Sequence, residues 1–114
     1  MIELVDGVAE YRWARRVGPP VDLNELASMC RYRAGNVADS LGISCRQLER
    51  DFRKDMGVAR KYWLREQRAQ RAIDLISSGT DLDSVSKELG FKRYGHFARE
   101  IRAFFGVKPV ELVE

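Results

Sequence analysis

The sequence has few of the residues that build metal centres, disulfide frameworks or membrane spans. Its 114 residues include one histidine, two cysteines and three prolines. No apolar run approaches the ~18 residues of a membrane-spanning helix. Neither Cys30 nor Cys45 belongs to a CxxC or Cys/His cluster, so no metal site is expected. The sequence also lacks a signal-peptide core, a nucleophile–base pair and a phosphate-binding glycine loop. We therefore expect a cytoplasmic protein that is not an enzyme and needs no cofactor.

Charge is plentiful by contrast, and it is unevenly distributed. Charged residues make up 32% of the chain and the net charge is +3. Between Ser44 and Arg71, nine Lys and Arg residues stand against four Asp and Glu, a local charge of +5. The rest of the chain sums to −2. A basic segment of this kind is typical of a surface that binds a polyanion, although most charge runs are simply solvated helix faces.

Two stretches of the sequence repeat each other. The pattern Val-x-x-x-Leu-Gly-apolar occurs at 37–43 and again 48 positions later, at 85–91. An apolar residue at 48, another at 52 and Gly-Val at 57–58 recur 49 positions later. One residue is therefore inserted after the turn of the second copy, where a loop tolerates it. The repeat predicts two copies of one small module.

Residues 58–78, between the two copies, are expected to form one long helix. Its apolar residues have helical spacing: Trp63, Leu64, Ala69, Ala72, Ile73 and Ile76. Gly57 and Gly79 stand at its two ends, and no proline interrupts it. At 1.5 Å per residue such a helix spans roughly 30 Å, close to the ~34 Å helical turn of B-DNA.

The first copy, about 34–57, has the pattern of a helix-turn-helix. A short helix ends at Gly42, which can adopt the positive φ of a sharp turn. Ser44 can then cap a second helix, 45–56, that buries Leu48 and Phe52. The opposite face of that helix carries Arg46, Gln47, Glu49, Arg50, Arg53 and Lys54. Because Arg33 stands where the second copy has a capping aspartate, we expect the first short helix to be frayed or joined to the helix before it.

The second copy, about 81–106, repeats this plan. Asp81 can cap its first helix, Gly90 makes the turn, and the outward helix 92–105 buries Phe97 and Ile101. The exposed side of that helix carries Arg93, Tyr94, Gly95, His96, Arg99 and Arg102. Gly106 ends it, and a final short helix follows with Pro109 near its first position.

Residues 1–20 are expected to form an N-terminal extension: a helix packed on the domain, a dimer contact or the remnant of a longer segment. Their apolar residues suggest an amphipathic helix weakened by Gly7: Ile2, Leu4, Val5, Val8, Tyr11, Trp13, Ala14 and Val17. The segment ends at Gly18-Pro19-Pro20, a clear break. Asp22 is then placed to cap a further helix whose apolar face includes Leu23 and Ala27.

Five motifs, in order and with consistent gaps, extend over residues 22–112. They are Val37-Ala-x-x-Leu-Gly-Ile-Ser44, Leu48-x-Arg50-x-Phe52-x-x-x-x-Gly57, Arg68-x-x-x-Ala72-x-x-Leu75-Ile76, Leu89-Gly90-Phe91, and His96-Phe97-x-Arg99-x-Ile-x-x-x-Phe105-Gly106-Val-x-Pro109. Together they resemble the DNA-binding domain of the AraC/XylS family of transcription regulators. The resemblance implies an all-α fold, over residues 21–114, of two helix-turn-helix subdomains joined by a long central helix.

The resemblance also implies that each subdomain places its second helix in one of two successive major grooves. Base-edge contacts are then expected from Arg46, Gln47, Glu49 and Arg50 of the first helix, and from Tyr94, His96 and Arg99 of the second. Arginine can bind guanine through two hydrogen bonds, glutamine can pair with adenine, and glutamate can accept from cytosine. Phosphate contacts are expected from Arg53, Lys54, Lys61, Arg65 and Arg93.

Two functions compete at this point. The leading hypothesis is a sequence-specific regulator that binds double-stranded DNA in the bacterial cytoplasm, associated with the nucleoid. The alternative is a degenerate helix-turn-helix module that docks on RNA polymerase or another regulator. Arginines on both outward faces favour DNA, but Arg50 and Arg99 have carboxylates nearby, Glu49 and Glu100, with which they can pair instead. Neither a small-molecule site nor a membrane contact is inferred.

Overall fold

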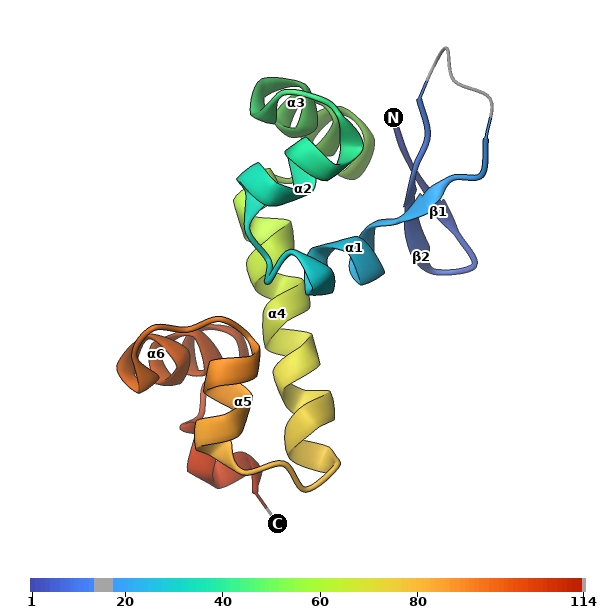
Figure 1. Ribbon diagram of the computed structural model, residues 1–114. Helices are drawn as coiled ribbons and strands as arrows, with labels where there is room; N and C mark the ends of the chain where they lie inside the picture. Colours follow the sequence, from blue (N-terminus) through green and yellow to red (C-terminus); the bar gives the residue numbers. More distant parts are fainter. Residues whose placement is uncertain (14–17, 114) are drawn as a thin grey trace. The chain divides into compact units, whose positions relative to one another are not determined.

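The computed structural model describes residues 1–13 and 18–113. The chain divides into two units, residues 1–64 and 65–114, and the division falls within helix α4 (Arg60–Ser77). The described residues form six α-helices, one short 3-10 helix and a three-stranded antiparallel sheet (Figure 1). The fold is therefore mostly helical as expected, but the all-α prediction is wrong because of the sheet. No helix among the described residues is long and apolar enough to cross a bilayer.

The sheet replaces the helix expected within residues 1–20. Strand β1 (Ile2–Val5) pairs with β2 (Val8–Tyr11), and β2 pairs in turn with the two-residue strand β3 (Val21–Asp22). Asp6 and Gly7 make the connection with φ of 51° and 81°. Two positive φ values at an Asp-Gly pair match the type I′ turn, whose twist suits a hairpin. Gly7 therefore closes a hairpin and does not weaken a helix. Ala14 and Val17 of the expected helix lie outside the described residues.

The hairpin is part of the hydrophobic core of the first unit. Ile2, Ala9 and Tyr11 are each at most 3% exposed and belong to the same buried cluster as Leu48 and Phe52. Strand β1 also contacts helix α3 (Cys45–Met56), where the Ile2 amide donates to Asp55 Oδ2 at 2.8 Å. The N-terminal segment thus packs against the first helix-turn-helix, as strands and not as the expected helix.

The caps at Asp22 and Ser44 and the turn at Gly42 lie where the sequence predicts, and the long helix expected at 58–78 is α4, Arg60–Ser77. Helix α1 (Leu23–Met29) is capped by Asp22, and α3 is capped by Ser44, whose hydroxyl accepts from the Gln47 amide at 3.0 Å. Helix α2 (Ala34–Leu41) ends at Gly42, in the left-handed region with φ of 69°. Arg33 makes no side-chain cap, yet α2 still begins at the next residue. Burial of Val37, Ala38 and Leu41 holds this helix, so the missing cap does not fray it.

The second unit repeats the same plan. Helix α5 (Leu82–Glu88) is capped by Asp81, whose carboxylate accepts from the Ser84 amide at 2.9 Å. That capping bond lowers the pKa of the Asp81 carboxyl. Gly90 makes the turn, α6 (Tyr94–Phe105) follows, and the 3-10 helix η1 (Pro109–Leu112) closes the chain. Phe97 and Ile101 of α6 are at most 1% exposed. The inward face of α6 is therefore fixed by burial, which determines the face left for solvent.

The hairpin turn predicts opposite effects for one substitution at two glycines. An added Cβ meets no atom within 4 Å at either Gly7 or Gly35, so packing does not distinguish the sites. Gly7→Ala places a side chain at positive φ and is expected to lower the free energy of unfolding by about 1 kcal/mol. Gly35→Ala, inside α2, is expected to raise it by about 0.5 kcal/mol. Urea denaturation of the two variants measures both, and a stabilising Gly7→Ala would contradict the turn.

Candidate nucleic-acid interface

Helix α3 presents a row of basic side chains opposite its buried stripe. Leu48 and Phe52 are buried, and a helix with that inward face turns positions about 180° away toward solvent. The side chains on that outward side are all exposed: Arg46, Arg50, Arg53 and Lys54. None of these four is buried against protein, so all are accessible to a polyanion.

Glu49, a predicted base contact, instead binds the first turn of helix α4. Its carboxylate accepts from the backbone amide of Arg60 at 2.9 Å and from the Arg60 guanidinium. The Arg53 guanidinium lies 3.4 Å from the same carboxylate. Because a carboxylate at a helix N-terminus satisfies free amide groups and the helix dipole, Glu49 serves the first turn of α4. The structure therefore does not present Glu49 as a free acceptor for cytosine.

Gln47 is held on the side of α3 that faces the hairpin. Its Nε2 donates to Asp51 Oδ1 at 3.0 Å, and its Oε1 accepts from the Arg50 guanidinium at 3.4 Å. Asp51 is 6% exposed and accepts a second hydrogen bond, at 2.6 Å, from the hydroxyl of Tyr11. Burial and the Asp51 carboxylate raise the pKa of Tyr11, because both disfavour the negatively charged tyrosinate.

Helix α6 presents a second exposed basic face. The helix begins at Tyr94, two residues later than predicted, so Arg93 is its N-cap. The side chains that the sequence assigned to this face are all exposed: Arg93, Tyr94, His96 and Arg99. They are joined by Arg102, which was expected on this face but given no role, and which matches Arg53 in the repeat. Gly95 stands where the first copy has Arg46, so α6 has no long side chain at that position. Tyr94 packs edge-on against Phe97, with ring centroids 5.5 Å apart.

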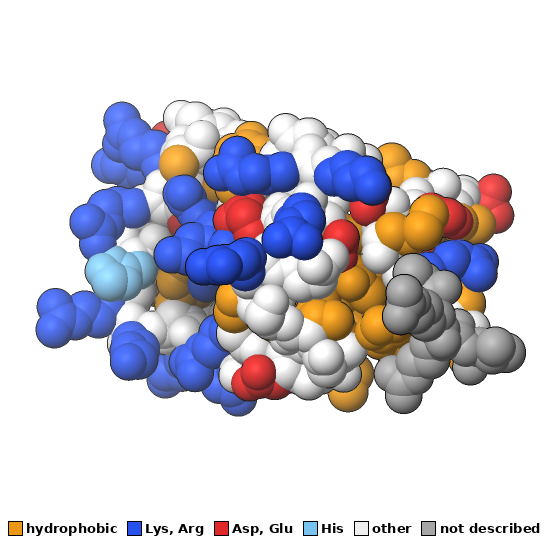
Figure 2. Space-filling model, turned by 90° about the horizontal axis from the view of Figure 1, so that it is seen from above, with side chains coloured by type: hydrophobic (Ala, Val, Ile, Leu, Met, Phe, Trp, Pro, Cys, Tyr) orange, Lys and Arg blue, Asp and Glu red, His pale blue; other side chains and the backbone are white. Residues whose placement is uncertain are grey.

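An open hollow of about 850 Å³ lies along one side of α6. It is lined mainly by basic side chains: Arg65, Arg68, Lys92, Arg93, His96 and Arg99. Figure 2 shows the single histidine among Lys and Arg side chains. The described residues contain no group of three His, Cys, Asp or Glu side chains that could hold a metal ion. The basic side chains give this surface the positive charge that binds phosphate groups.

One buried carboxylate organises the cations around that hollow. Glu100 is 7% exposed and accepts two hydrogen bonds from Arg68, one of them at 2.8 Å. Arg65, half exposed, lies 3.7 Å from the same carboxylate. The Arg68 guanidinium also stacks over Phe91, 4.2 Å from the ring centroid. Of the predicted phosphate contacts, Arg65 is thus partly engaged within the protein, whereas Lys61, in the first unit, is exposed.

Breaking the Arg68–Glu100 pair is expected to destabilise the second unit. Arg68→Ala leaves a buried carboxylate without its two-bond partner and is expected to cost about 3 kcal/mol of unfolding free energy. Replacing both partners by apolar residues, Arg68→Met with Glu100→Leu, is expected to recover most of that loss. Arg71→Ala, an exposed position on the same helix, is the control and is expected to change stability by less than about 0.5 kcal/mol. A double variant as unstable as Arg68→Ala alone would contradict this assignment.

Comparisons with known proteins identify the family. A family model described as a helix-turn-helix domain matches residues 37–114. The arabinose operon regulatory protein of Escherichia coli is 27% identical over 104 residues, which cover 82% of this chain and 35% of that protein. The chain therefore spans about a third of the length of that relative.

Solved structures agree with this assignment. A probable AraC family transcriptional regulator from Rhodopseudomonas palustris is 29% identical, with a TM-score of 0.62 and coverage of 80% of this chain and 90% of that one. The C-terminal domain of the response regulator yesN from Fusobacterium nucleatum shares the fold at 17% identity, with a TM-score of 0.69 and coverage of 81% and 90%. This chain belongs to the AraC/XylS family of helix-turn-helix, DNA-binding transcription regulators.

Proposed function

We propose that this protein regulates transcription by reading two successive major grooves of DNA with α3 and α6. The observation that carries the proposal is the exposed row of arginines that each helix bears opposite its buried stripe. A recognition helix reads bases with side chains on the face that enters the groove, and arginine is the side chain best suited to guanine. The protein would act in the bacterial cytoplasm, on the nucleoid.

The contacts within each unit divide the predicted site into three groups. We assign base reading to Arg46 and Arg50 of α3 and to His96 and Arg99 of α6, with Tyr94 at the start of α6 beside them. We assign phosphate binding to Arg53, Lys54, Lys61, Arg65, Arg93 and Arg102. Gln47 and Glu49 leave the base-reading set, because Asp51 and Arg60 already occupy their polar atoms. Among the described residues, five assigned arginines form no ion pair, and their free charge favours DNA over a docking module: Arg46, Arg50, Arg93, Arg99 and Arg102.

Base-reading arginines are expected to act on single base positions. Selection of bound fragments from random DNA first defines the site, which should contain two half-sites about one helical turn apart. Arg50→Ala or Arg46→Ala is expected to weaken binding to that site by about 1–3 kcal/mol and to relax one base position in one half-site. Arg99→Ala is expected to relax a position in the other half-site. Relaxation of the same half-site by Arg50→Ala and Arg99→Ala would contradict the two-groove assignment.

Phosphate-binding residues are expected to behave differently. Lys54→Ala should weaken binding to all sequences alike and reduce the steepness with which affinity falls as salt rises, by roughly one unit in the log–log slope. Arg71→Ala, exposed on α4 outside the assigned set, is the charge-matched control. A gel-shift titration over a series of salt concentrations measures both. Wild-type affinity that does not depend on salt would favour the docking module and RNA polymerase or another regulator as its partner.

A further inference from the structure

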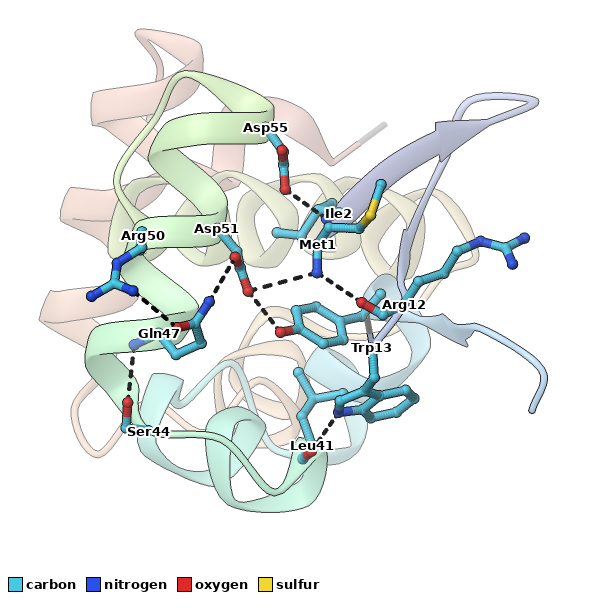
Figure 3. A network of polar contacts seen from close by, with 11 residues as sticks. Met1, Ile2, Arg12, Trp13, Leu41, Ser44, Gln47, Arg50, Asp51 and Asp55 are labelled. Atoms are coloured by element: carbon cyan, nitrogen blue, oxygen red, sulfur yellow. Dashed lines mark hydrogen bonds and ion pairs between the residues drawn. The ribbon is translucent and has the colours of Figure 1, made fainter. Parts of the chain in front are cut away.

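A chain of hydrogen bonds runs from the N-terminal hairpin to an exposed arginine of α3 (Figure 3). Tyr11 of β2 donates to Asp51 at 2.6 Å, Gln47 donates to Asp51 at 3.0 Å, and Arg50 donates to Gln47 at 3.4 Å. The first link is buried, the second partly buried and the third exposed. The chain thus connects the core of the first unit to a side chain on the outward face of its recognition helix.

The chemistry of the donors and acceptors gives this chain one direction. A carboxylate only accepts hydrogen bonds and a guanidinium only donates them. The amide between Asp51 and Arg50 must therefore turn its NH₂ toward Asp51 and its oxygen toward Arg50. The reverse orientation places two acceptors together at one end and two donors together at the other. Gln47 in this orientation has its NH₂ bound to Asp51 and its oxygen bound to Arg50, so the amide orients Arg50 and is not free to turn toward adenine.

Tyr11 is held rigidly enough to act as the origin of the chain. Its ring is 3% exposed and meets the Trp13 ring edge-on, with centroids 5.4 Å apart. The Trp13 indole donates in turn to the Leu41 carbonyl of α2 at 2.9 Å. On the other strand the Ile2 amide is bound to Asp55 of α3. The hairpin is thus tied to both helices of the first helix-turn-helix, and Tyr11 cannot shift without them.

We propose that Tyr11 is a positioning residue for base recognition: through Asp51 and Gln47 it sets the orientation in which Arg50 meets DNA. The proposal rests on the proposed function and deepens it, because it assigns a role in specificity to the hairpin behind α3. A free arginine must be ordered when it binds, and holding it beforehand reduces that cost. Gln47 acts in the same chain and not as a reader of bases.

The test uses the full chain and the variant Tyr11→Phe, which removes one hydroxyl and keeps the buried ring. The quantity measured is the ratio of affinities for the selected site and for the same site changed at the base position that Arg50→Ala relaxes. We expect Tyr11→Phe to lower this ratio by about three- to tenfold, as when one interface side chain must be ordered on binding. Discrimination in the half-site read by α6 should not change.

Two comparisons separate positioning from a loss of stability. Val37→Ala removes buried carbons from α2 but none of the residues in the Tyr11–Asp51–Gln47–Arg50 hydrogen bonds. A lower folded fraction reduces the affinity for every DNA sequence by the same factor, so Val37→Ala should leave the ratio unchanged. In the Arg50→Ala background, Tyr11→Phe should have no further effect on the ratio, because the side chain that Tyr11 orients is absent. Nitrogen-15 spectra should also show the Gln47 side-chain amide signals moving in Tyr11→Phe and staying in place in Val37→Ala.

Three results would overturn the proposal. They are an unchanged ratio in Tyr11→Phe, the same change in the presence and absence of Arg50, and a ratio lowered equally by Val37→Ala. Failure of the proposed function looks different: wild-type protein then selects no sequence, or Arg50→Ala relaxes no base position. In that case the amide signals still report whether Tyr11 orients Gln47.

Discussion

Each recognition helix carries one carboxylate that burial has removed from water. Asp51 and Glu100 occupy equivalent positions in the repeat, 49 residues apart, and are 6% and 7% exposed. A buried carboxylate costs several kcal/mol unless hydrogen bonds replace its lost water. The buried carboxylate must face the interior, where its hydrogen-bond donors lie. The need for these donors helps to fix how the helix is rotated about its axis. The arginines at Arg50 and Arg99, one residue earlier in each copy, are then directed outward.

The two units satisfy this requirement with different donors, and the difference affects the charge left for DNA. In the first unit Asp51 is bound by the neutral Tyr11 hydroxyl and Gln47 amide, and the N-terminal ammonium of Met1 lies 3.8 Å away. No arginine of α3 or α4 is among these partners of Asp51. In the second unit Glu100 takes up Arg68 and part of Arg65. Asp51 therefore takes up no arginine, although Arg53 of α3 lies beside Glu49, whereas Glu100 of α6 takes part in an internal ion pair.

Much of the fold follows from the sequence because its signals are local. Gly42, Gly57 and Gly106 all end helices at positive φ, as their places in the repeat predict. Ser44 and Asp81 both cap helices. The helix predicted for residues 1–20 is wrong, although the signal for a hairpin is equally local. Four residues pair on each side of Asp6-Gly7, a dipeptide typical of a type I′ turn. Apolar residues of so short a segment fit helical and strand spacing alike, and only the turn dipeptide decides between them.

For the site, the sequence predicts which side chains are exposed but not which partners they meet. Helical spacing identifies which side chains face outward, and exposure agrees for the basic residues of both helices. Spacing does not identify partners that arrive from elsewhere in the chain. Glu49 meets the start of α4, eleven residues on, and Asp51 meets Tyr11, forty residues back. Gln47 and Asp51 are four residues apart, so helical spacing allows them to pair, but spacing does not show that Asp51 is buried. The burial of Asp51 under the hairpin is what holds the Gln47 amide in one orientation. That burial depends on the pairing of β1 with β2, which the helical spacing of residues 1–20 does not predict.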